Sequence, residues 1–338
     1  MKNKSITIPK GYKSPMNIKE TEIAIKDVKD YFERALAKEL NLTRVSAPLF
    51  VRPESGLNDN LNGVERPVAF GIREQDEAVA EIVHSLAKWK RLALSKYGFV
   101  HGEGLYTDMS AIRRDEDTDN LHSIYVDQWD WEKIIDKKER NVKTLKAVVR
   151  QVYEAMKNTE VFINARYPQI KKILPDEITF VTTQELEDRY PQMSPKERER
   201  EAAKEYGAVF LMQIGKTLAS GKRHDGRAPD YDDWELNGDI IVYYPLLDIG
   251  MELSSMGIRV DETSLKKQLK KAGCSERAKL PFQKAILNKE LPYTIGGGIG
   301  QSRICMFFLR RAHIGEVQSS IWPEGVIEYA HEHGVNIL

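Results

Sequence analysis

Apolar residues recur every three or four positions in two long stretches of the chain, and this spacing predicts two long amphipathic helices. The first stretch surrounds residues 25–36 and the second surrounds residues 145–156. A shorter helix is predicted over residues 88–92, with Ser85 as its N-cap, because a serine hydroxyl can satisfy a free amide at a helix start. A last helix is predicted directly after the glycines of residues 296–300.

Short runs of β-branched, aromatic and aliphatic residues predict strands between these helices. The predicted strands cover residues 44–51, 81–84, 123–126, 178–181, 209–212, 240–244 and 248–253. The Asn237-Gly238 pair indicates a hairpin turn, because this dipeptide favours the left-handed conformations that tight turns need. Strands in hairpin-like runs with irregularly inserted helices predict an α+β fold around an antiparallel sheet.

No internal repeat or Gly/Ser-rich linker divides the sequence, so we expect a single domain over residues 1–338 that begins with an extended segment, 1–15. The 51 basic and 51 acidic side chains cancel, which argues against a broad nucleic-acid-binding surface. No stretch approaches the roughly 20 apolar residues of a membrane helix, and residues 1–15 lack the apolar core of a secretory signal. The two cysteines do not suggest a disulfide framework, so a reducing cytoplasm is the simplest expected location.

Three segments concentrate residues that suit a site for a nucleotide and a small anion. In residues 294–303, a glycine cluster precedes a helix whose first turn contains Arg303, which could clamp phosphate or stack on a base. A tight turn with a solvated arginine is an equally open interpretation. The cluster is not a P-loop, because no Gly-Lys-Ser/Thr follows it.

In the second segment, Arg113 precedes an acidic loop, and acidic residues then alternate with Trp129 and Trp131. A solvated surface loop rarely needs two tryptophans, so this alternation favours carboxylates placed in a dry pocket. In the third segment, the carboxylates of residues 230–233, Asp239 and Glu252 could bind Mg²⁺, which prefers oxygen ligands and usually bridges phosphates. A solvated acidic turn is the alternative for residues 230–233.

Six blocks together make the chain resemble the ammonia-dependent asparagine synthetases, or aspartate–ammonia ligases, over nearly its whole length. The blocks are VHSLAKWKR (83–91), GEGLYTDM (102–109), HSIYVDQWDWE (122–132), RAPDYDDW (227–234), ELSSMGIRVD (252–261) and TIGGGIGQSR (294–303). That family is similar to the catalytic core of class II aminoacyl-tRNA synthetases. The resemblance implies an antiparallel sheet flanked by helices, a homodimer, and synthesis of asparagine from aspartate, ammonia and ATP through a β-aspartyl-adenylate.

The resemblance also implies roles for individual residues. Asp59, Arg113 and Arg303 would be catalytic, with Asp59 near the ammonia and the two arginines near the reacting carboxylate and phosphate. The residues implied in aspartate binding are Ser85, Lys90, Gln128, Asp130, Asp232 and Ser255. Those implied in nucleotide binding are Tyr231, Leu253, Arg259 and Arg303, with Asp239 and Glu252 as the metal candidates.

Two observations separate the possible nitrogen donors and the rival functions. A glutaminase needs a nucleophilic cysteine with a base nearby, whereas Cys305 lies in an apolar helical run, so free ammonia is the expected donor. A tRNA-charging paralogue would share the adenylate chemistry but should have an appended tRNA-binding domain. A silent regulatory paralogue remains the other alternative, against which the presence of Arg113, Asp130, Glu252 and Arg303 argues.

Overall fold

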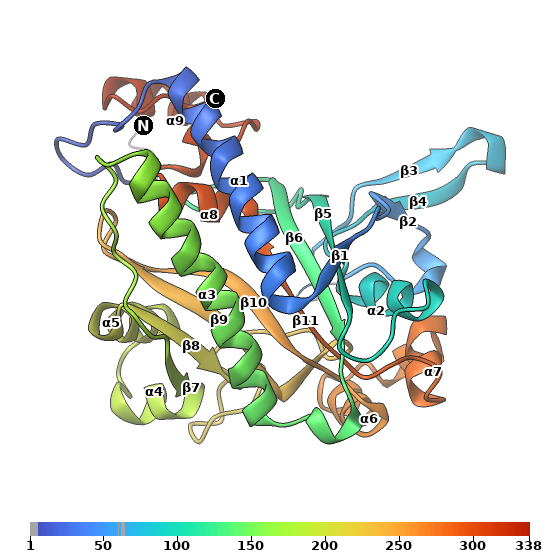
Figure 1. Ribbon diagram of the computed structural model, residues 1–338. Helices are drawn as coiled ribbons and strands as arrows, with labels where there is room; N and C mark the ends of the chain where they lie inside the picture. Colours follow the sequence, from blue (N-terminus) through green and yellow to red (C-terminus); the bar gives the residue numbers. More distant parts are fainter. Residues whose placement is uncertain (1–5, 60, 62–64) are drawn as a thin grey trace.

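The computed structural model describes residues 6–59, 61 and 65–338, and within them an eight-stranded sheet runs through the molecule in the order β1-β5-β6-β11-β10-β9-β8-β7 (Figure 1). Its strands are β1 (Leu42–Arg44), β5 (Gly104–Ile112), β6 (Tyr125–Ile134), β7 (Thr179–Thr182), β8 (Ala208–Met212), β9 (Asp232–Tyr244), β10 (Ile249–Arg259) and β11 (Thr294–Gly300). A smaller sheet in the same residues has the order β2-β4-β3, and its β3–β4 hairpin projects from the side of the molecule. Its strands are β2 (Phe50–Val51), β3 (Ala69–Ile72) and β4 (Ala78–Ile82).

The main sheet is mixed, so the predicted purely antiparallel sheet is wrong at both edges. The central pairs, from β5–β6 to β9–β8, are antiparallel as predicted. The outer pairs β1–β5 and β7–β8 are parallel. Parallel neighbours require a crossover connection, and the helices α4 (Thr183–Arg189) and α5 (Pro195–Tyr206) provide one between β7 and β8.

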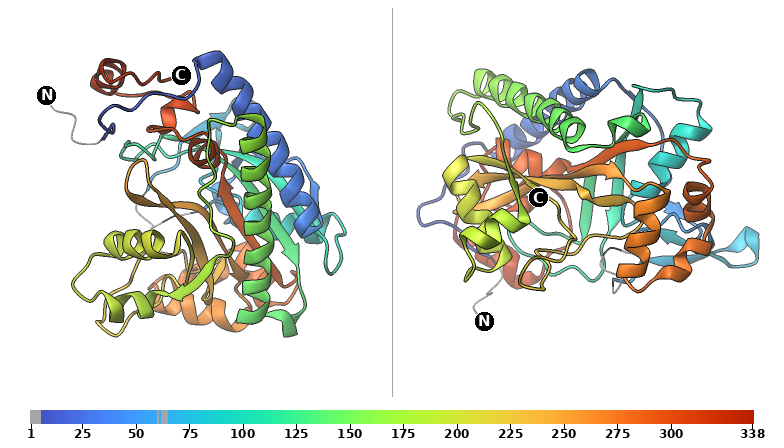
Figure 2. Two further views of the ribbon diagram at one scale, coloured as in Figure 1. Left: turned by 60° about the vertical axis from the view of Figure 1, so that its left-hand side comes forward. Right: turned by 90° about the horizontal axis from the view of Figure 1, so that it is seen from below.

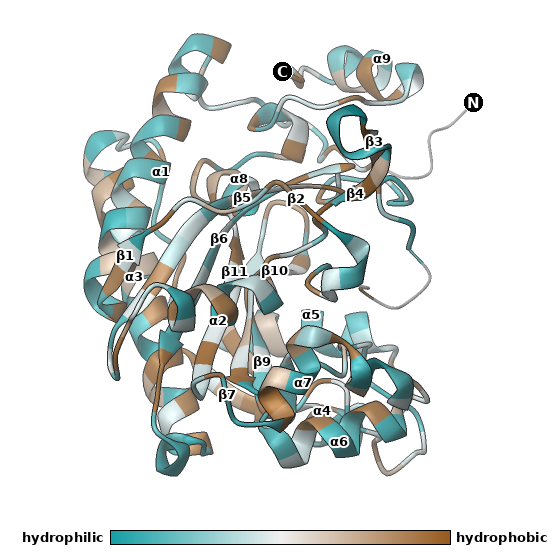
Figure 3. Ribbon diagram, turned by 90° about the vertical axis from the view of Figure 1, so that its right-hand side faces the viewer, coloured by the Kyte–Doolittle hydropathy of each residue, from teal (hydrophilic) through white to brown (hydrophobic). Residues whose placement is uncertain are grey.

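Helices α1 (Ile18–Leu40) and α3 (Val142–Arg166) lie side by side across one face of the main sheet (Figures 1 and 2). Both confirm the predicted long helices, and each begins at an asparagine N-cap, Asn17 or Asn141. Their helical ribbons alternate hydrophobic with hydrophilic positions (Figure 3), as expected when one face packs on a core. The remaining α-helices of the described residues are α2 (Ala87–Lys96), α6 (Glu262–Lys271), α7 (Pro281–Leu287), α8 (Gln301–Phe308) and α9 (Glu324–Glu332).

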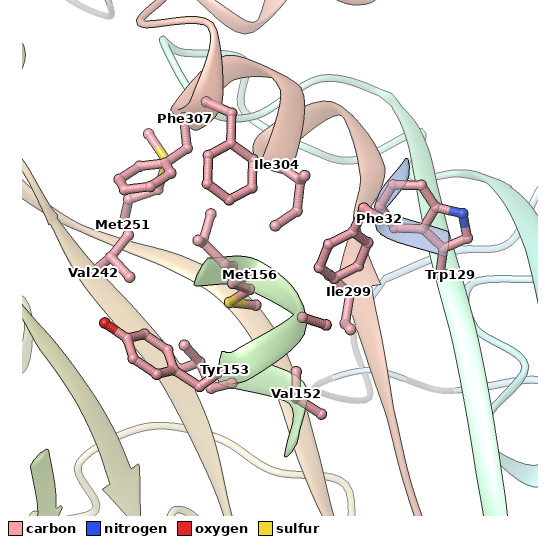
Figure 4. Packing of buried hydrophobic residues seen from close by; sticks show 14 of the residues in the cluster. Phe32, Trp129, Val152, Tyr153, Met156, Val242, Met251, Ile299, Ile304 and Phe307 are labelled. Atoms are coloured by element: carbon pink, nitrogen blue, oxygen red, sulfur yellow. The ribbon is translucent and has the colours of Figure 1, made fainter. Parts of the chain in front are cut away.

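The largest hydrophobic core fills the space between this face of the sheet and helices α1, α3 and α8. Figure 4 shows Phe32 of α1 beside Trp129 of β6, and Met156 of α3 below Ile304 of α8. The rings of Phe32 and Trp129 have centroids 4.9 Å apart. Because successive residues of a strand point to opposite faces, burying Trp129 and Trp131 here directs Gln128, Asp130 and Glu132 to the other face. None of the helices in the described residues is both long and apolar enough to cross a membrane.

The predicted hairpin turn at Asn237-Gly238 is wrong, because a small residue is closely packed inside the sheet there. Asn237 and Gly238 lie within β9, and the turn to β10 falls at residues 245–248 instead. Asn237 Oδ1 accepts a hydrogen bond from the backbone N–H of Ile214, and Asn237 Nδ2 donates one to the Ile214 carbonyl oxygen. A Cβ on Gly238 would lie 2.3 Å from the Leu211 carbonyl oxygen. Residues 294–300 form β11, so the tight turn left open as an alternative is not found there, and α8 follows at once as predicted.

The predicted N-cap of α2 is also wrong. The N-cap position is Leu86, without a side-chain cap, and the Ser85 hydroxyl donates to the Asp59 carboxylate at 2.8 Å. The predicted extended segment 1–15 is described only from residue 6, and residues 6–15 contain no helix or strand.

Candidate active site

The polar face of the central strands forms the floor of a cavity of about 470 Å³. Each predicted site residue except Asp239 lines it. The lining members of that set are Asp59, Ser85, Lys90, Arg113, Gln128, Asp130, Tyr231, Asp232, Glu252, Leu253, Ser255, Arg259 and Arg303. Residues from segments far apart in the sequence therefore meet in one place, as the predicted grouping requires.

Glycines of β11 make the floor flat enough to hold polar side chains above it. A Cβ on Gly296 would lie 2.0 Å from Glu132 Oε2, and one on Gly298 would lie 2.6 Å from Gln128 Oε1. The glycine cluster thus makes room for the side chains of the neighbouring strand β6, with which β11 pairs antiparallel. Its function in the site is to leave space, since these glycines do not form a phosphate-binding turn.

Helix α2 places a buried lysine against this floor. Lys90 is 1% exposed; its Nζ donates to the Gly297 carbonyl at 2.8 Å and lies 3.4 Å from Asp130 Oδ1. Asp130 Oδ2 accepts from the backbone N–H of Leu86 at 3.0 Å. Burial lowers the pKa of Lys90, while the neighbouring Asp130 carboxylate favours its charged form. This lysine–aspartate pair offers one cationic and one anionic group side by side, which suits a zwitterionic ligand.

Asp59 forms a second anionic position at the cavity wall and is only 3% exposed. Its Oδ2 accepts from the Ser85 hydroxyl at 2.8 Å, and its Oδ1 accepts from the backbone N–H of Leu61 at 2.9 Å. The neighbouring Asn60 lies outside the described residues. Asp59 is therefore held in place by two hydrogen bonds and has lone pairs left for a ligand.

Arg259 belongs to a buried ion-pair network and is not a free guanidinium. Its Nη2 lies 2.8 Å from Glu132 Oε2, and its Nη1 donates to Asp232. Burial opposes the charge of Arg259, but the Glu132 and Asp232 carboxylates outweigh that effect and raise its pKa. The Arg259 guanidinium also lies over the Tyr231 ring, 5.7 Å from its centroid. We conclude that this network mainly holds Tyr231 and Asp232 at the cavity edge.

Arg227 completes the floor and was not among the predicted site residues. Its Nη2 bonds Asp239 Oδ1 at 2.6 Å, and its Nη1 donates to the Ser255 hydroxyl. Its Nε is buried without a hydrogen-bond partner among the described residues. The residue stands first in the RAPDYDDW block, so the sequence contained the signal, although its long-range partners Asp239 and Ser255 could not be read from that block.

Two arginines line the cavity and make few hydrogen bonds to other described residues. Arg113 follows β5; its Nη1 lies 3.8 Å from Glu116, and its Nε is buried without a partner among the described residues. Arg303, in the first turn of α8, donates from Nη1 to the Glu252 carbonyl at 3.2 Å. Guanidinium groups with few internal partners are suited to bind a phosphate or carboxylate.

The two metal candidates lie on adjacent strands and share one face of the sheet. Glu252 pairs in register with Ile241, two residues from Asp239, so both carboxylates point the same way. Burial raises the pKa of Asp239 and repulsion by Glu252 adds to this effect, whereas Arg303 and Lys196 lower the pKa of Glu252 despite its burial. Oxygen donors of this kind fit Mg²⁺, which is commonly bound by one or two carboxylates together with phosphates.

A second group of possible metal ligands lies elsewhere on the molecule, with its ligand atoms close together. Within the part of the chain that the structure describes, His101, Asp136 and Glu139 have ligand atoms within 4.8 Å of one another. None of the three lines the cavity, and His101 Nε2 is already paired with Glu139 Oε2 at 2.7 Å. This surface cluster therefore has no bearing on the chemistry of the cavity.

The raised pKa of Asp239 predicts that the free energy of unfolding depends on pH. Burial is the main cause that raises its pKa to about 7, Arg227 opposes this effect, and Glu252 adds to it. Because an unfolded aspartate titrates near about 3.9, the folded chain binds more protons between about pH 4 and about pH 7. The contribution of Asp239 to the free energy of unfolding should therefore fall as pH rises through this window and stay constant above it.

The measurement compares urea unfolding of the wild type and Asp239→Asn across this window. The stability of the wild type relative to the variant should decline with rising pH. Parallel pH profiles for the two proteins would show that Asp239 titrates alike in the folded and unfolded chains.

Further cavity residues escaped prediction because their sequence context is ordinary. Glu132 ends the HSIYVDQWDWE block, His84 lies inside VHSLAKWKR, and Lys196 is the second residue of the polar helix α5. His84 and Lys196 line the cavity directly, and Glu132 lies beneath it. Only the three-dimensional arrangement distinguishes these residues from structural or solvated ones.

The cysteines are unsuited to nucleophilic catalysis, as expected. Cys305 is fully buried, and burial raises the pKa of its thiol to about 12. Cys274 is half-buried, and its pKa is also raised by burial. A thiol must ionise to attack a glutamine amide, so neither residue supplies a glutaminase nucleophile.

Comparisons with known proteins identify relatives of the whole chain and of its fold. A family model described as aspartate-ammonia ligase matches residues 19–334. The aspartate–ammonia ligase of Ruminiclostridium cellulolyticum is 65% identical over 99% of both chains, and that of Clostridium perfringens is 66% identical over 98% of both. Among solved structures, Entamoeba histolytica asparaginyl-tRNA synthetase in complex with asparaginyl-adenylate matches with a TM-score of 0.63 at 14% identity. That match covers 89% of this chain and 66% of the synthetase chain, and it concerns the fold alone.

Proposed function

The chain belongs to the aspartate–ammonia ligase family, and we propose that its cavity joins ammonia to the side-chain carboxylate of L-aspartate with ATP as the activating substrate. The enzyme forms a β-aspartyl-adenylate and releases L-asparagine, AMP and pyrophosphate. The observation that carries this proposal is the meeting of Lys90, Asp130, Arg113 and Arg303 in one cavity. The asparaginyl-adenylate bound by a synthetase of the same fold supports an adenylate of similar size here.

Aspartate binding is assigned to the Lys90–Asp130 pair and its surroundings. Lys90 attracts the α-carboxylate and Asp130 the α-ammonium, with Ser85 and Gln128 as additional hydrogen-bonding groups. Asp232 and Ser255 extend the polar floor toward the nucleotide. The Asp130 carboxylate is fixed by Leu86 N–H, so it binds the substrate amine without first having to be ordered.

Adenylation needs stabilisation of the negative charge that develops on the α-phosphate. Arg113 is assigned to bridge the attacking carboxylate and this phosphate, and Arg303, in the first turn of α8, to support the nucleotide. Tyr231 and Leu253 line the nucleotide side, and Arg259 keeps Tyr231 in position. Asp239 and Glu252 would hold Mg²⁺, which when bound neutralises phosphate charge.

Ammonia capture is assigned to Asp59. At neutral pH ammonia is mostly present as ammonium, which a carboxylate attracts. The cavity position of Asp59 and its two fixed hydrogen bonds support this assignment, because they orient the carboxylate without neutralising it. Free ammonia is the nitrogen donor, in agreement with the buried, weakly acidic thiol of Cys305.

Product analysis tests the proposed function. Aspartate, ammonium and Mg-ATP are expected to give asparagine, AMP and pyrophosphate in equal amounts, whereas glutamine in place of ammonium should give at least about 100-fold slower synthesis, because a glutaminase nucleophile is missing. Formation of ADP and phosphate would contradict the adenylate, and formation of aspartyl-tRNA or asparaginyl-tRNA without free asparagine would favour a tRNA-charging enzyme.

We also propose a homodimer in the cytoplasm. The small sheet carries exposed apolar side chains at Phe50, Phe70 and Val79, and Leu49 directly before β2 is exposed as well. The rings of Phe50 and Phe70 are in edge-to-face contact, with centroids 5.3 Å apart. A group of exposed apolar residues of this kind is typical of a protein contact surface. The two unpaired cysteines are consistent with a reducing compartment.

A further inference from the structure

His84 is a buried cavity residue to which the proposed chemistry has so far assigned no role. It connects β4 to α2, is 1% exposed, and lines the cavity next to Asp59. Its backbone N–H donates to Asn58 Oδ1 at 2.9 Å, and Asn58 Nδ2 in turn donates to Glu81 Oε2 at 3.0 Å. The ring is therefore held against the same loop that supplies Asp59.

The hydrogen bonds of the ring define its tautomer. His84 Nδ1 lies 3.1 Å from the Asp59 carbonyl oxygen, which can only accept a hydrogen bond. Nδ1 must therefore carry the proton, and in the neutral ring Nε2 is an acceptor with a free lone pair. This Nε2 is buried, and no described residue donates to it. An unpaired buried acceptor is unfavourable, so a ligand that donates a hydrogen bond would find a vacant partner here.

The part of the cavity that His84 and Asp59 line favours a ligand that is small, cationic and rich in donors. The Asp59 carboxylate accepts one hydrogen bond at each oxygen, from Leu61 and Ser85, and has further lone pairs. The negative charge of Asp59 also reaches Tyr231 across the cavity. Two acceptor groups on two contacting loops, one of them charged, match ammonium, which has four N–H donors and no lone pair.

On the basis of the proposed function, we propose that His84 Nε2 is the catalytic base that takes a proton from the ammonium ion held by Asp59. The ammonium N–H bond breaks, and its proton forms the imidazolium of His84. The freed ammonia lone pair forms a bond to the β-carbonyl carbon of the adenylate. The carbon–oxygen bond to AMP then breaks, AMP leaves with the electron pair, and the new C–N group loses its second proton to water.

Two variants separate this role from a structural one. In His84→Asn the amide N–H₂ can replace Nδ1 as donor to the Asp59 carbonyl, and in His84→Gln an amide group approaches the position of Nε2; neither amide is a base. Each variant is assayed with ammonium and with hydroxylamine, a nucleophile that is largely unprotonated at neutral pH. His101→Asn, at an exposed histidine outside the cavity, is the matched control.

We expect kcat/KM for ammonium to fall at least about 100-fold in both His84 variants, while the rate with hydroxylamine falls less than about threefold. Equal losses with the two nucleophiles in both variants would overturn the proposal, because a structural role or misfolding affects both alike. Full activity with ammonium in either variant would also overturn it. Failure of the proposed function is distinguishable, since the wild type would then show no aspartate-dependent exchange between pyrophosphate and ATP.

Discussion

Replacing Arg113 with alanine is expected to slow adenylate formation by roughly 10²–10³-fold, the usual effect of removing one donor that stabilises charge in a transition state. The guanidinium lies at the cavity end of β5, only 26% exposed, with a loose contact to Glu116 and an unpartnered Nε among the described residues. Few internal interactions are lost in the variant, so the effect should concern the reaction and not the fold. Aspartate-dependent exchange of pyrophosphate into ATP measures this step without ammonia.

Two further variants serve as controls for Arg113→Ala. Arg113→Lys keeps the charge but loses the two-pronged geometry, so we expect an intermediate rate. Arg189→Ala removes a half-exposed arginine outside the cavity and should leave the exchange rate unchanged. An Arg113→Ala rate within about threefold of the wild type would show that this arginine does not stabilise the transition state.

Removing Glu132 is expected to have the largest effect on stability. This carboxylate is fully buried, accepts three hydrogen bonds from Arg259, and accepts another from Thr294 at 2.6 Å. Glu132→Ala leaves the Arg259 charge buried with Asp232 as its remaining carboxylate partner, so the free energy of unfolding should fall by about 3–5 kcal/mol. Urea unfolding monitored by tryptophan fluorescence and circular dichroism measures the change.

The matched control for Glu132 breaks an exposed ion pair. Glu205 contacts Arg189 at 2.6 Å, with side chains that are 39% and 45% exposed. Since solvent screens such pairs, Glu205→Ala should cost less than about 1 kcal/mol. Similar small losses in both variants would mean that the Arg259–Glu132 pair contributes little net stability.

Local pattern was sufficient to predict the elements whose apolar faces cover the core. The spacing of Val28, Phe32 and Leu36 predicted α1, and that of Val149, Val152 and Met156 predicted α3, because both helices bury one continuous apolar stripe. Strand β6 was predicted too short, at residues 123–126, because its buried acidic residues disfavour a strand on local grounds. They are stabilised by Lys90 and Arg259, which come from distant parts of the sequence.

Contacts between residues far apart in the sequence also explain the wrong turn prediction and the site residues that were not predicted. Asn237-Gly238 has the local chemistry of a turn, yet its contacts to Ile214 and Leu211 from the neighbouring strand region keep it extended. The family blocks contained Arg227 and Glu132, but their partners lie up to 162 residues away. Sequence could therefore indicate which residues belong to the site, whereas their pairing, and the buried free acceptor of His84, required the structure.

The central claim, activation of the side-chain carboxylate of aspartate by transfer to AMP, is tested most directly by oxygen isotope transfer. Aspartate labelled with ¹⁸O at both β-carboxylate oxygens is converted with ammonium and unlabelled Mg-ATP, and the products are analysed by mass spectrometry. The adenylate mechanism predicts one ¹⁸O in the phosphate of AMP, one in the amide of asparagine and none in pyrophosphate. Unlabelled AMP, or label in inorganic phosphate formed together with ADP, would contradict it.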